Sequence, residues 1–496
     1  MTAVWPHLPA LQIIVPLFGA LIAGFLPRGT AGFWVALVVS WLMPFIAGGL
    51  LWQVLASGPI SYHMGGWEPP WGIEYRVDLL NAFVLMLIAV IGAVSIPFAR
   101  RSVTRETEGR EAWFYCMYLL CLTGLLGITV TGDAFNAFVF LEISSLSTYV
   151  LIATGMDRRA VLAAYQYLIM GTIGATFYVI GIGFLYLLTG SLNFVDIAQR
   201  LAAAGPQHFA PMMAALAFIA VGVSLKLALF PLHVWLPNAY AYSPSFATAF
   251  LAATATKVAI YLLIRLIFSV FGVAIDFETL PIGPVMIALS LAAMFIAAAI
   301  AVFETDLKRM LAYSSVSQIG YITLGIGLAN KAGLTGSIVH LANHAIMKAA
   351  LFLALGSVFY RLGTVSLDAV SGLGRRMPLT FAAFTIAALG LIGTPGTVGF
   401  ISKWYLAVGA LDKGSWALVF AIVASSLISV VYLGRILEAA WFREEAPGVK
   451  EATDPPLSML LPLLALAAMT IYFGIDTRMT ADLASRAAEM LLGGLK

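Results

Sequence analysis

Four ionisable side chains lie inside long apolar runs, where a charge is expensive. Lys226 lies in VSLKLALFPLHVW, Lys257 in ATATKVAIYLLIR, Lys403 in GFISKWYL and Glu142 in FVFLEISSLSTYVLIA. On insertion scales, a charged side chain at the centre of a bilayer costs about 2.5–3.5 kcal/mol. Such groups usually face one another or a wet path, and they mark routes for ions or protons. The pattern therefore predicts proton or ion transfer within a membrane.

Glu142 and Lys226 are expected to act together. Ser144, Ser145 and Ser147 follow Glu142 closely and can hold water or relay protons. One interpretation is a structural ion pair that locks two helices. The preferred one is a switch, because desolvation weakens the hold of a buried amine on its proton and a nearby carboxylate restores it.

The other two lysines each have a competing interpretation. Lys257 is near the middle of its apolar run, which favours a pathway residue over a side chain that snorkels to the membrane surface. Arg265 is nearer the end of the same run, so snorkelling is preferred for it. Lys403 precedes Trp404 and Tyr405, and an interfacial anchor is as acceptable there as a pathway residue.

Histidines form a second cluster, in VHLANHAIMKAALF. His340, His344 and Lys348 follow one another at intervals of four residues, which places all three along one helix face. Zinc binding is disfavoured because the intervening Leu-Ala-Asn lacks a general-base Glu and no third ligand is evident. A proton relay is preferred, since histidine titrates near neutral pH. His233, in PLHVW, is expected to be a relay or a capping residue.

Composition identifies the elements that must position these groups. Of 496 residues, 61% are apolar and only 10% are charged, against about 25% charged in soluble domains. This excludes a soluble enzyme, a nucleic-acid binder and a disordered scaffold. It predicts an all-α integral membrane protein of about fourteen transmembrane helices, the first a retained helix and not a cleaved signal. The expected spans lie near residues 9–26, 32–55, 79–98, 113–130, 134–154, 160–188, 211–230, 244–270, 281–303, 310–329, 333–360, 378–408, 415–437 and 457–474.

Two spans are expected to be broken, one within Val223–Leu236 by Pro231 and Pro237, the other within Gly390–Lys403 by a Gly-Thr-Pro-Gly turn. Each break should free backbone carbonyls and amides at membrane depth. Pro231 and Pro395 are separated by nearly as many residues as the starts of the fourth and ninth spans. Paired interruptions of this kind indicate a transporter built from repeats.

Lysine and arginine concentrate in the loops that follow odd-numbered spans, as in the segment from Arg100 to Arg110. The positive-inside rule then predicts cytoplasmic odd loops and both termini outside.

The glycine-rich GLIGTPGTVGFISK lacks the Gly-Lys-Ser/Thr of a phosphate loop, and no Rossmann, haem or iron–sulfur motif is present. The two cysteines, Cys116 and Cys121, form no metal set. No cofactor, no metal and no redox centre are expected, and the chain is predicted to be a non-enzymatic subunit.

Several motifs together resemble the antiporter-like subunit family. They are FLEISSLSTY, SLKLALFPLHVWLPNAYAYSPS, DLKRMLAYSSVSQIGYI, HLANHAIMKAALF and GTPGTVGFISKWYL, and they cover residues 113 to 437. This family comprises Mrp-type multisubunit cation/proton antiporters and the proton-pumping membrane subunits of NADH–quinone oxidoreductase (complex I) and related hydrogenases.

The resemblance implies fourteen helices containing two inverted five-helix repeats, each with a broken helix. The expected regions are an N-terminal three-helix region (1–112), a first repeat (113–270), a second repeat (281–437) and a C-terminal helix and tail (438–496). It also implies roles: Glu142 as the helix-five glutamate, Lys226 as the broken-helix lysine, Lys257 as the central lysine and Lys403 as the exit-side lysine. His340, His344 and Lys348 correspond to the family's relay on helix eleven.

The segment HMGGWEPPWGIEYRVD (63–78) most resembles the D subunit of Mrp antiporters, and Lys403 argues against a complex I subunit that has glutamate there. The resemblance thus implies a proton-translocating subunit of a Na⁺ (or other monovalent cation)/H⁺ antiporter in a bacterial cell membrane, with other subunits as partners and no nucleic acid. The alternatives are a proton-pumping subunit of a complex I-like oxidoreductase or hydrogenase, and a passive structural subunit.

Overall fold

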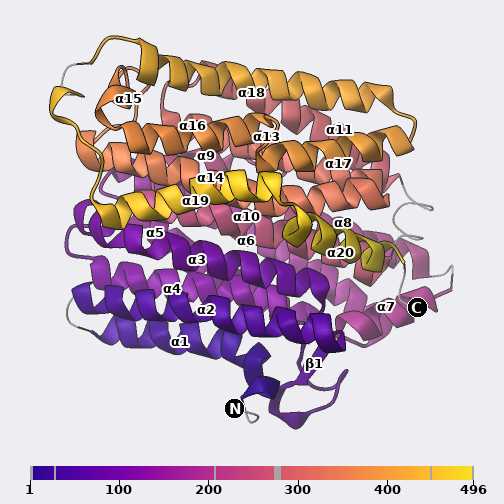
Figure 1. Cartoon of the computed structure of the whole chain (residues 1–496). Coiled ribbons are helices and arrows are strands. Elements are labelled where there is room, and N and C mark those ends of the chain that lie inside the picture. Colours follow the sequence, from indigo (N-terminus) through magenta and orange to yellow (C-terminus); the bar gives the residue numbers. More distant parts are fainter. Residues whose placement is uncertain (1–3, 27–28, 206–207, 273–280, 447–448, 494–496) are drawn as a thin grey trace.

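The computed structural model describes residues 4–26, 29–205, 208–272, 281–446 and 449–493. Nearly all of them are in helices, which run side by side along one common direction (Figure 1). Among the described residues, twelve helices are long and apolar enough to cross a membrane. The chain is an all-α, multi-pass integral membrane protein, and this prediction is confirmed.

Two expected spans fall outside that count for physical reasons. The helix α13 (Leu307–Leu328) has full length but is rich in polar side chains such as Ser317 and Gln318. The helices α16 (Pro378–Ile392) and α17 (Val398–Asp412) are each short because the chain breaks between them. The total of fourteen spans stays a prediction.

The N-terminal region holds three long helices and a small hairpin that the sequence analysis did not predict. After the short helix η1 (Trp5–His7) come α1 (Leu8–Phe25), α2 (Gly29–Ser57), β1 (Ile60–His63), the single turn η2 (Met64–Gly66), β2 (Glu74–Val77) and α3 (Leu79–Glu106). The strands are antiparallel, with Ile60 opposite Val77 and His63 opposite Glu74. Each strand has only four residues, too short for a reliable alternating pattern in the sequence.

The segment of the first expected five-helix repeat includes the helices that carry Glu142, Lys226 and Lys257. Its elements are α4 (Glu111–Val130), α5 (Ala134–Ala153), α6 (Arg158–Thr189), α7 (Phe194–Ala202), α8 (Phe209–Leu227), α9 (Trp235–Tyr242), α10 (Ser245–Arg265) and the π-helical turn η4 (Leu266–Phe271). The three residues lie in α5, α8 and α10, in that order.

The second expected repeat and the C-terminal part complete the bundle. Their elements are α11 (Ile282–Ala292), η6 (Ala293–Ala297), α12 (Ala298–Phe303), α13, α14 (Lys331–Leu362), α15 (Leu373–Arg376), α16, α17, α18 (Trp416–Phe442), η7 (Val449–Glu451), α19 (Leu457–Ile475), η8 (Arg478–Asp482) and α20 (Leu483–Leu492). The last of these lies in what was expected to be a tail.

Local features recur between the two halves at a constant offset. In each half, an aspartate caps the N-terminus of a helix. The backbone of that aspartate forms an isolated antiparallel β-bridge with a residue of a second segment. That second segment follows a helix whose C-terminus is capped by glycine. Both glycines adopt the left-handed conformation, with φ of 67° and 72°. The equivalent residues are Asp133 and Asp306, Asn193 and Ser366, and Gly190 and Gly363, each separated by 173 positions. The three pairs share one offset, and the two five-helix repeats stay a prediction.

Both predicted breaks are present. The helix α8 ends where Ala228 adopts a left-handed φ of 60°, and α16 ends at Gly393 with a φ of 94°. One detail of the prediction was wrong: Pro237 does not interrupt a helix but lies within the first turn of α9. Proline is tolerated there because the first amides of a helix have no intrahelical partner.

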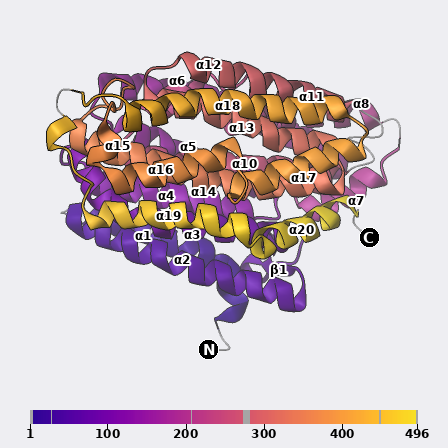
Figure 2. The same ribbon diagram turned by 45° about the horizontal axis from the view of Figure 1, so that its top comes forward.

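Two helices form the centre of the molecule. The side chains of α14 are buried along its membrane-length window, and those of α10 nearly so. The two helices pack against each other, and α14 also contacts α13 and α17 (Figure 2). Polar residues on these helices are therefore held away from lipid.

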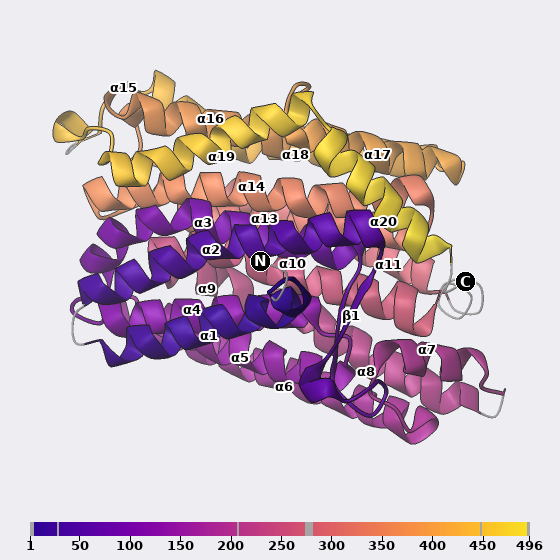
Figure 3. The same cartoon turned by 60° about the horizontal axis from the view of Figure 1, so that its bottom comes forward.

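The two ends of the bundle differ. The hairpin, α7 and α20 lie at one end, which we call the hairpin face (Figure 3). Both ends of the described chain meet there: His7 hydrogen-bonds with Tyr62 at 3.0 Å, and Leu491 lies beside Asp78. An even number of spans requires the two ends to share a face. Which side of the membrane that face meets stays a prediction.

Candidate functional site

The predicted Glu142–Lys226 pair exists in the structure. Glu142 Oε1 lies 3.7 Å from Lys226 Nζ, and the two side chains are 26% and 5% exposed. Lys226 also donates to Ser145 Oγ at 2.5 Å and to Tyr149 Oη at 3.5 Å. Lys226 thus has two hydroxyl partners and a carboxylate at ion-pair distance.

The break after α8 positions this pair. Lys226 is the penultimate residue of α8, where a cation is favoured by the carbonyl ends of the helix. The carbonyl of Leu225 is satisfied by Trp235 Nε1 at 2.9 Å, which ties α9 to the end of α8. His233, in the same break, is buried and stacks on Phe230 with 5.2 Å between ring centroids.

Lys257 is fully buried in the middle of α10. Its Nζ donates to the carbonyl of Ala252 and to Thr256 Oγ1 at 3.3 Å. In the described part of the chain, it takes part in no ion pair. Burial at this position excludes snorkelling and leaves Lys257 compensated only by neutral dipoles.

The cluster on α14 faces the centre, as the spacing predicts. His340, His344 and Lys348 are all fully buried. Lys348 Nζ donates to the carbonyl of Leu311 at 2.8 Å and to Ser314 Oγ on α13. The rings of His340 and His344 are nearly parallel, with centroids 5.9 Å apart. Lys257 lies on α10, which packs against the α14 helix that carries His344 and Lys348.

His340 connects this cluster to the second break. Its Nδ1 hydrogen-bonds with Ser402 Oγ at 2.7 Å and its Nε2 with Gln318 Oε1 at 3.0 Å. Ser402 directly precedes Lys403 in α17, but no hydrogen bond among the described residues joins their side chains.

Lys403 is buried and points toward the end of α16. It donates to the carbonyls of Leu391 and Ile392 at 3.1 and 2.7 Å, and to Ser426 Oγ at 2.8 Å. The break at Gly393 frees these carbonyls, since no amide follows to bond them within the helix. Because the ammonium lies inside the bundle, the interfacial-anchor interpretation is wrong.

The site therefore has four parts. These are the Glu142–Lys226 pair, Lys257 alone, the α14 cluster and Lys403 in the second break. No direct hydrogen bond among the described residues joins Lys226 to Lys257 or Lys257 to Lys348. The two ring nitrogens of His344 also have no hydrogen-bond partner among the described residues. Transfer across all these gaps needs water or a moving side chain.

Sequence reasoning was wrong about Arg265. It does not snorkel but forms an ion pair with Asp78, with Nη1 2.7 Å from Oδ2 and both side chains nearly buried. The competing force is electrostatic: a buried carboxylate at the start of α3 holds the guanidinium more tightly than the membrane surface attracts it. The sequence Asp78-Leu-Leu-Asn81 is a recognisable helix cap, but nothing in it names the partner.

Glu106 and Lys308 were also missed. Glu106 accepts from the amide and hydroxyl of Ser245 at 2.8 and 3.0 Å, so it caps α10. Lys308 donates to the carbonyl of Ser243 at 3.2 Å. Both line a cavity of about 430 Å³ opposite the hairpin face, together with Arg159. The side chain of Lys308 is buried.

Fold and site together define a class: a polytopic membrane protein whose ionisable groups are kept inside the bundle, an arrangement typical of proteins that translocate ions or protons. The chain belongs to the family described as NADH:quinone oxidoreductase/Mrp antiporter, TM, which matches residues 131–429.

Relatives from both branches of this family are similar to the chain. The N subunit of the NADH-quinone oxidoreductase of Desulforudis audaxviator is 41% identical over 491 residues, covering 95% of this chain and 96% of that protein. The D subunit of the Na⁺/H⁺ antiporter of Alkalihalophilus pseudofirmus is 29% identical over 441 residues, covering 89% and 88%. The family prediction is confirmed. The relatives belong to both of its branches, the quinone oxidoreductases and the antiporters.

Solved structures show the same fold. A chain of the Mrp complex from Dietzia sp. is 28% identical, with a TM-score of 0.88 over 99% of this chain and 98% of that one. A chain of the archaeal membrane-bound sulfane sulfur reductase, described as a respiratory membrane complex, is 30% identical, with a TM-score of 0.88 and coverage of 98% for both chains.

Proposed function

We propose that this chain is the proton-translocating membrane subunit of a multisubunit complex that exchanges Na⁺ or another monovalent cation for protons. The observation that carries the proposal is the Glu142–Lys226 pair at 3.7 Å, which lies beside a buried series of lysines and histidines that ends at Lys403. Intramembrane ionisable groups without a lipid-facing position are characteristic of proton pathways.

The pair is the loading step. When Glu142 lies close, its charge stabilises the proton on Lys226; when it withdraws, only Ser145 and Tyr149 remain to compensate the ammonium. Desolvation then favours release of the proton. His233, in the same break, is assigned as a relay, since no side-chain cap is present among the described residues at the start of α9.

The central step depends on like charges. Lys257 and Lys348 share the interior between α10 and α14, and two ammonium groups there repel each other strongly because the surroundings screen little. A proton that arrives at Lys257 therefore drives the proton on Lys348 onward. His344 and His340 carry it toward Ser402 and Lys403.

The comparisons supply the setting. The similar chains named above include members of an antiporter and of respiratory complexes, and two of the similar structures are multisubunit complexes. We assign this chain the same kind of place: a non-enzymatic subunit in a bacterial cell membrane, with both termini outside, other membrane subunits as partners, and the two five-helix repeats 113–270 and 281–437.

The test is transport by the assembled complex. Glu142→Ala and Lys226→Ala should each abolish Na⁺/H⁺ exchange in vesicles while the complex still assembles. Glu142→Gln, which keeps the shape, is the matched variant and should fail in the same way. Normal exchange in the assembled alanine variants would overturn the proposal.

A complex I-like role is the second candidate, favoured by the 41% identity to a quinone oxidoreductase subunit. In that case quinone reduction, and not a cation gradient, drives the protons. Purifying the native complex decides between the two: small antiporter subunits and exchange that differs among Na⁺, K⁺ and Li⁺ support the first, whereas redox subunits and electron-driven pumping support the second. A passive structural role is contradicted if an assembled Lys403 variant loses proton transport.

A further inference from the structure

A cavity with several polar side chains in its lining opens at the hairpin face, at the opposite end of α10 from Glu106. Its volume is about 210 Å³. Its polar lining comes from Arg76, Asp78, Asn81, Thr131 and Ser269, and α7 and α20 cover it with apolar side chains. One water needs roughly 10–15 Å³ of such space and two to four polar partners, so the cavity can hold several waters.

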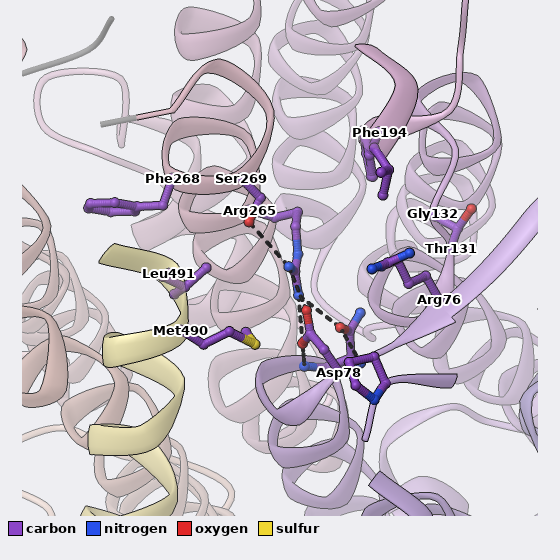
Figure 4. A pocket seen from close by; sticks show the side chains of 13 residues that line it. Arg76, Asp78, Thr131, Gly132, Phe194, Arg265, Phe268, Ser269, Met490 and Leu491 are labelled. Carbon is purple, nitrogen blue, oxygen red and sulfur yellow. Dashed lines mark hydrogen bonds and ion pairs between the residues drawn. The ribbon is translucent and has the colours of Figure 1, made fainter. Parts of the chain in front are cut away.

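The Asp78–Arg265 ion pair is part of the lining of this cavity (Figure 4). Besides its contacts with Asp78 at 2.7 and 2.9 Å, Arg265 donates to Asn81 Oδ1 at 2.8 Å and to Ser269 Oγ at 3.2 Å. The guanidinium thus keeps two neutral partners if it leaves the carboxylate. The same neutral contacts lower the cost of opening the pair.

Behind the pair, polar groups continue toward the interior. Asn81 Nδ2 donates to Tyr261 Oη at 2.6 Å, and the Tyr261 hydroxyl donates to the carbonyl of Thr129 at 3.0 Å. Tyr261 lies one helical turn from Arg265 and one turn from Lys257, on the same face of α10. Arg265, Tyr261 and Lys257 therefore occupy successive turns of one face of α10, and the Lys257 ammonium continues in the same direction to the carbonyl of Ala252.

We propose that this cavity is an aqueous entrance from the hairpin face to the buried lysines, and that the Asp78–Arg265 pair is the gate that closes it. Water and the protons it carries would reach Tyr261, and then Lys257, only while the pair is open. This gives the first repeat its own access to the hairpin face, separate from Lys403. It rests on the proposed function, because an entrance needs a pathway to serve.

The ordinary alternative is a clamp that holds α3 against α10. The two helices are antiparallel and are also tied at their other ends, where Glu106 accepts from Ser245. A clamp does not require a polar cavity on its open side or a hydroxyl behind it. A buried ion pair is also weak evidence for stability, since apolar replacements are often tolerated.

Thiol labelling separates gate from clamp. The assembled complex carries Cys116→Ala and Cys121→Ala, and each variant then receives one new cysteine. Ser269→Cys lies on the cavity side of the pair and Tyr261→Cys lies behind it. Thr323→Cys is a buried control that lines none of the described cavities. A charged, membrane-impermeant methanethiosulfonate is applied from the hairpin face. S269C should react, whereas Y261C and T323C should not.

Opening the ion pair should raise the labelling rate of Y261C and leave that of T323C unchanged. With Arg265→Met, which is of similar length but uncharged, Y261C should react at least about tenfold faster, while T323C stays unreactive. Arg265→Lys keeps the charge and should keep Y261C protected. Asp78→Asn, which still accepts the capping hydrogen bonds of α3, is the second way to open the pair. Arg265→Met should also raise passive proton leak in vesicles that lack a cation gradient.

Three results would overturn the entrance. S269C that does not react means that the cavity is dry. Equal Y261C rates with and without Arg265 mean that the pair is no gate. Failure of both Arg265→Met and Asp78→Asn to assemble, while Arg265→Lys assembles, means that the pair is a clamp. Gated labelling together with normal exchange in Glu142→Ala would instead leave the entrance standing and reject the proposed pathway.

Discussion

The two halves of the bundle hold their break-associated lysines differently. In the first half, Lys226 has a carboxylate at 3.7 Å. In the second half, Lys403 has carbonyls of its own broken helix and one hydroxyl. At the 173-residue offset, the position of Glu142 is taken by Ser315. A carboxylate changes the energy of a nearby proton as it moves, whereas backbone carbonyls are fixed dipoles. Under the proposed function, we expect the first half to switch and the second half to hold and release the proton.

Changing Lys403 tests the releasing half with the largest expected effect. Lys403→Arg keeps the positive charge and most of the length, but a guanidinium does not deprotonate in proteins. Transport should fall on the order of a hundredfold, the range in which loss of one proton-transfer group lies. Proton uptake by vesicles containing the assembled complex measures this. A variant with near-normal rates would show that Lys403 never gives up its proton.

Adding a carboxylate beside Lys348 in the second half tests whether a neutral partner at that lysine is needed for fast transport. Ser314 Oγ accepts from Lys348, so Ser314→Asp creates an ion pair where the native chain has a neutral contact. The new charge should trap the proton on Lys348 and slow transport about tenfold, which corresponds to about 1.4 kcal/mol in the barrier. Ser314→Asn is the matched neutral control. Equal rates for the two variants would remove the proposed distinction between the halves.

A smaller effect is expected at the link between the α14 cluster and Lys403. Ser402→Ala removes the hydroxyl that hydrogen-bonds with His340 Nδ1 at 2.7 Å. Water can replace a hydroxyl in a relay, so transport should fall only a few-fold, roughly threefold. Ser402→Thr keeps the hydroxyl and should stay near the native rate. If Ser402→Ala were as damaging as Lys403→Arg, the hydroxyl would be an obligatory relay and not a replaceable one.

The smallest effect belongs to a surface pair outside the membrane spans. Arg376 donates to Glu445 at 2.8 Å and lowers the pKa of that carboxyl, mainly by the hydrogen bond. Any stability that the pair gives is present above the ordinary pKa of glutamate and is lost as the pH falls through the lowered value. Arg376→Gln should leave transport unchanged and lower the melting temperature at pH 7 by no more than about 1 °C. This difference should vanish in acid; its persistence there would point to packing instead of charge.

Much of the site could be predicted because charge in an apolar run is a strong signal. Glu142, Lys226, Lys257 and Lys403 were all found in this way, and the four-residue spacing placed the α14 cluster on one face. The partners of these groups could not be predicted. Ser314, Gln318 and Ser402 are ordinary polar residues in sequence, and they become partners only because α13 and α17 pack against α14.

The sequence by itself determined that the chain spans a membrane many times, where its helices break and which charges must be kept from lipid, because these follow from local hydropathy and backbone chemistry. Tertiary structure alone decided that Arg265 turns inward to Asp78, that Lys257 has no carboxylate within reach among the described residues, and that Lys403 rests on the end of its own broken helix. Each of these depends on the distance between segments far apart in the chain, and electrostatic energy depends on that distance and on the surrounding burial, which no local pattern records.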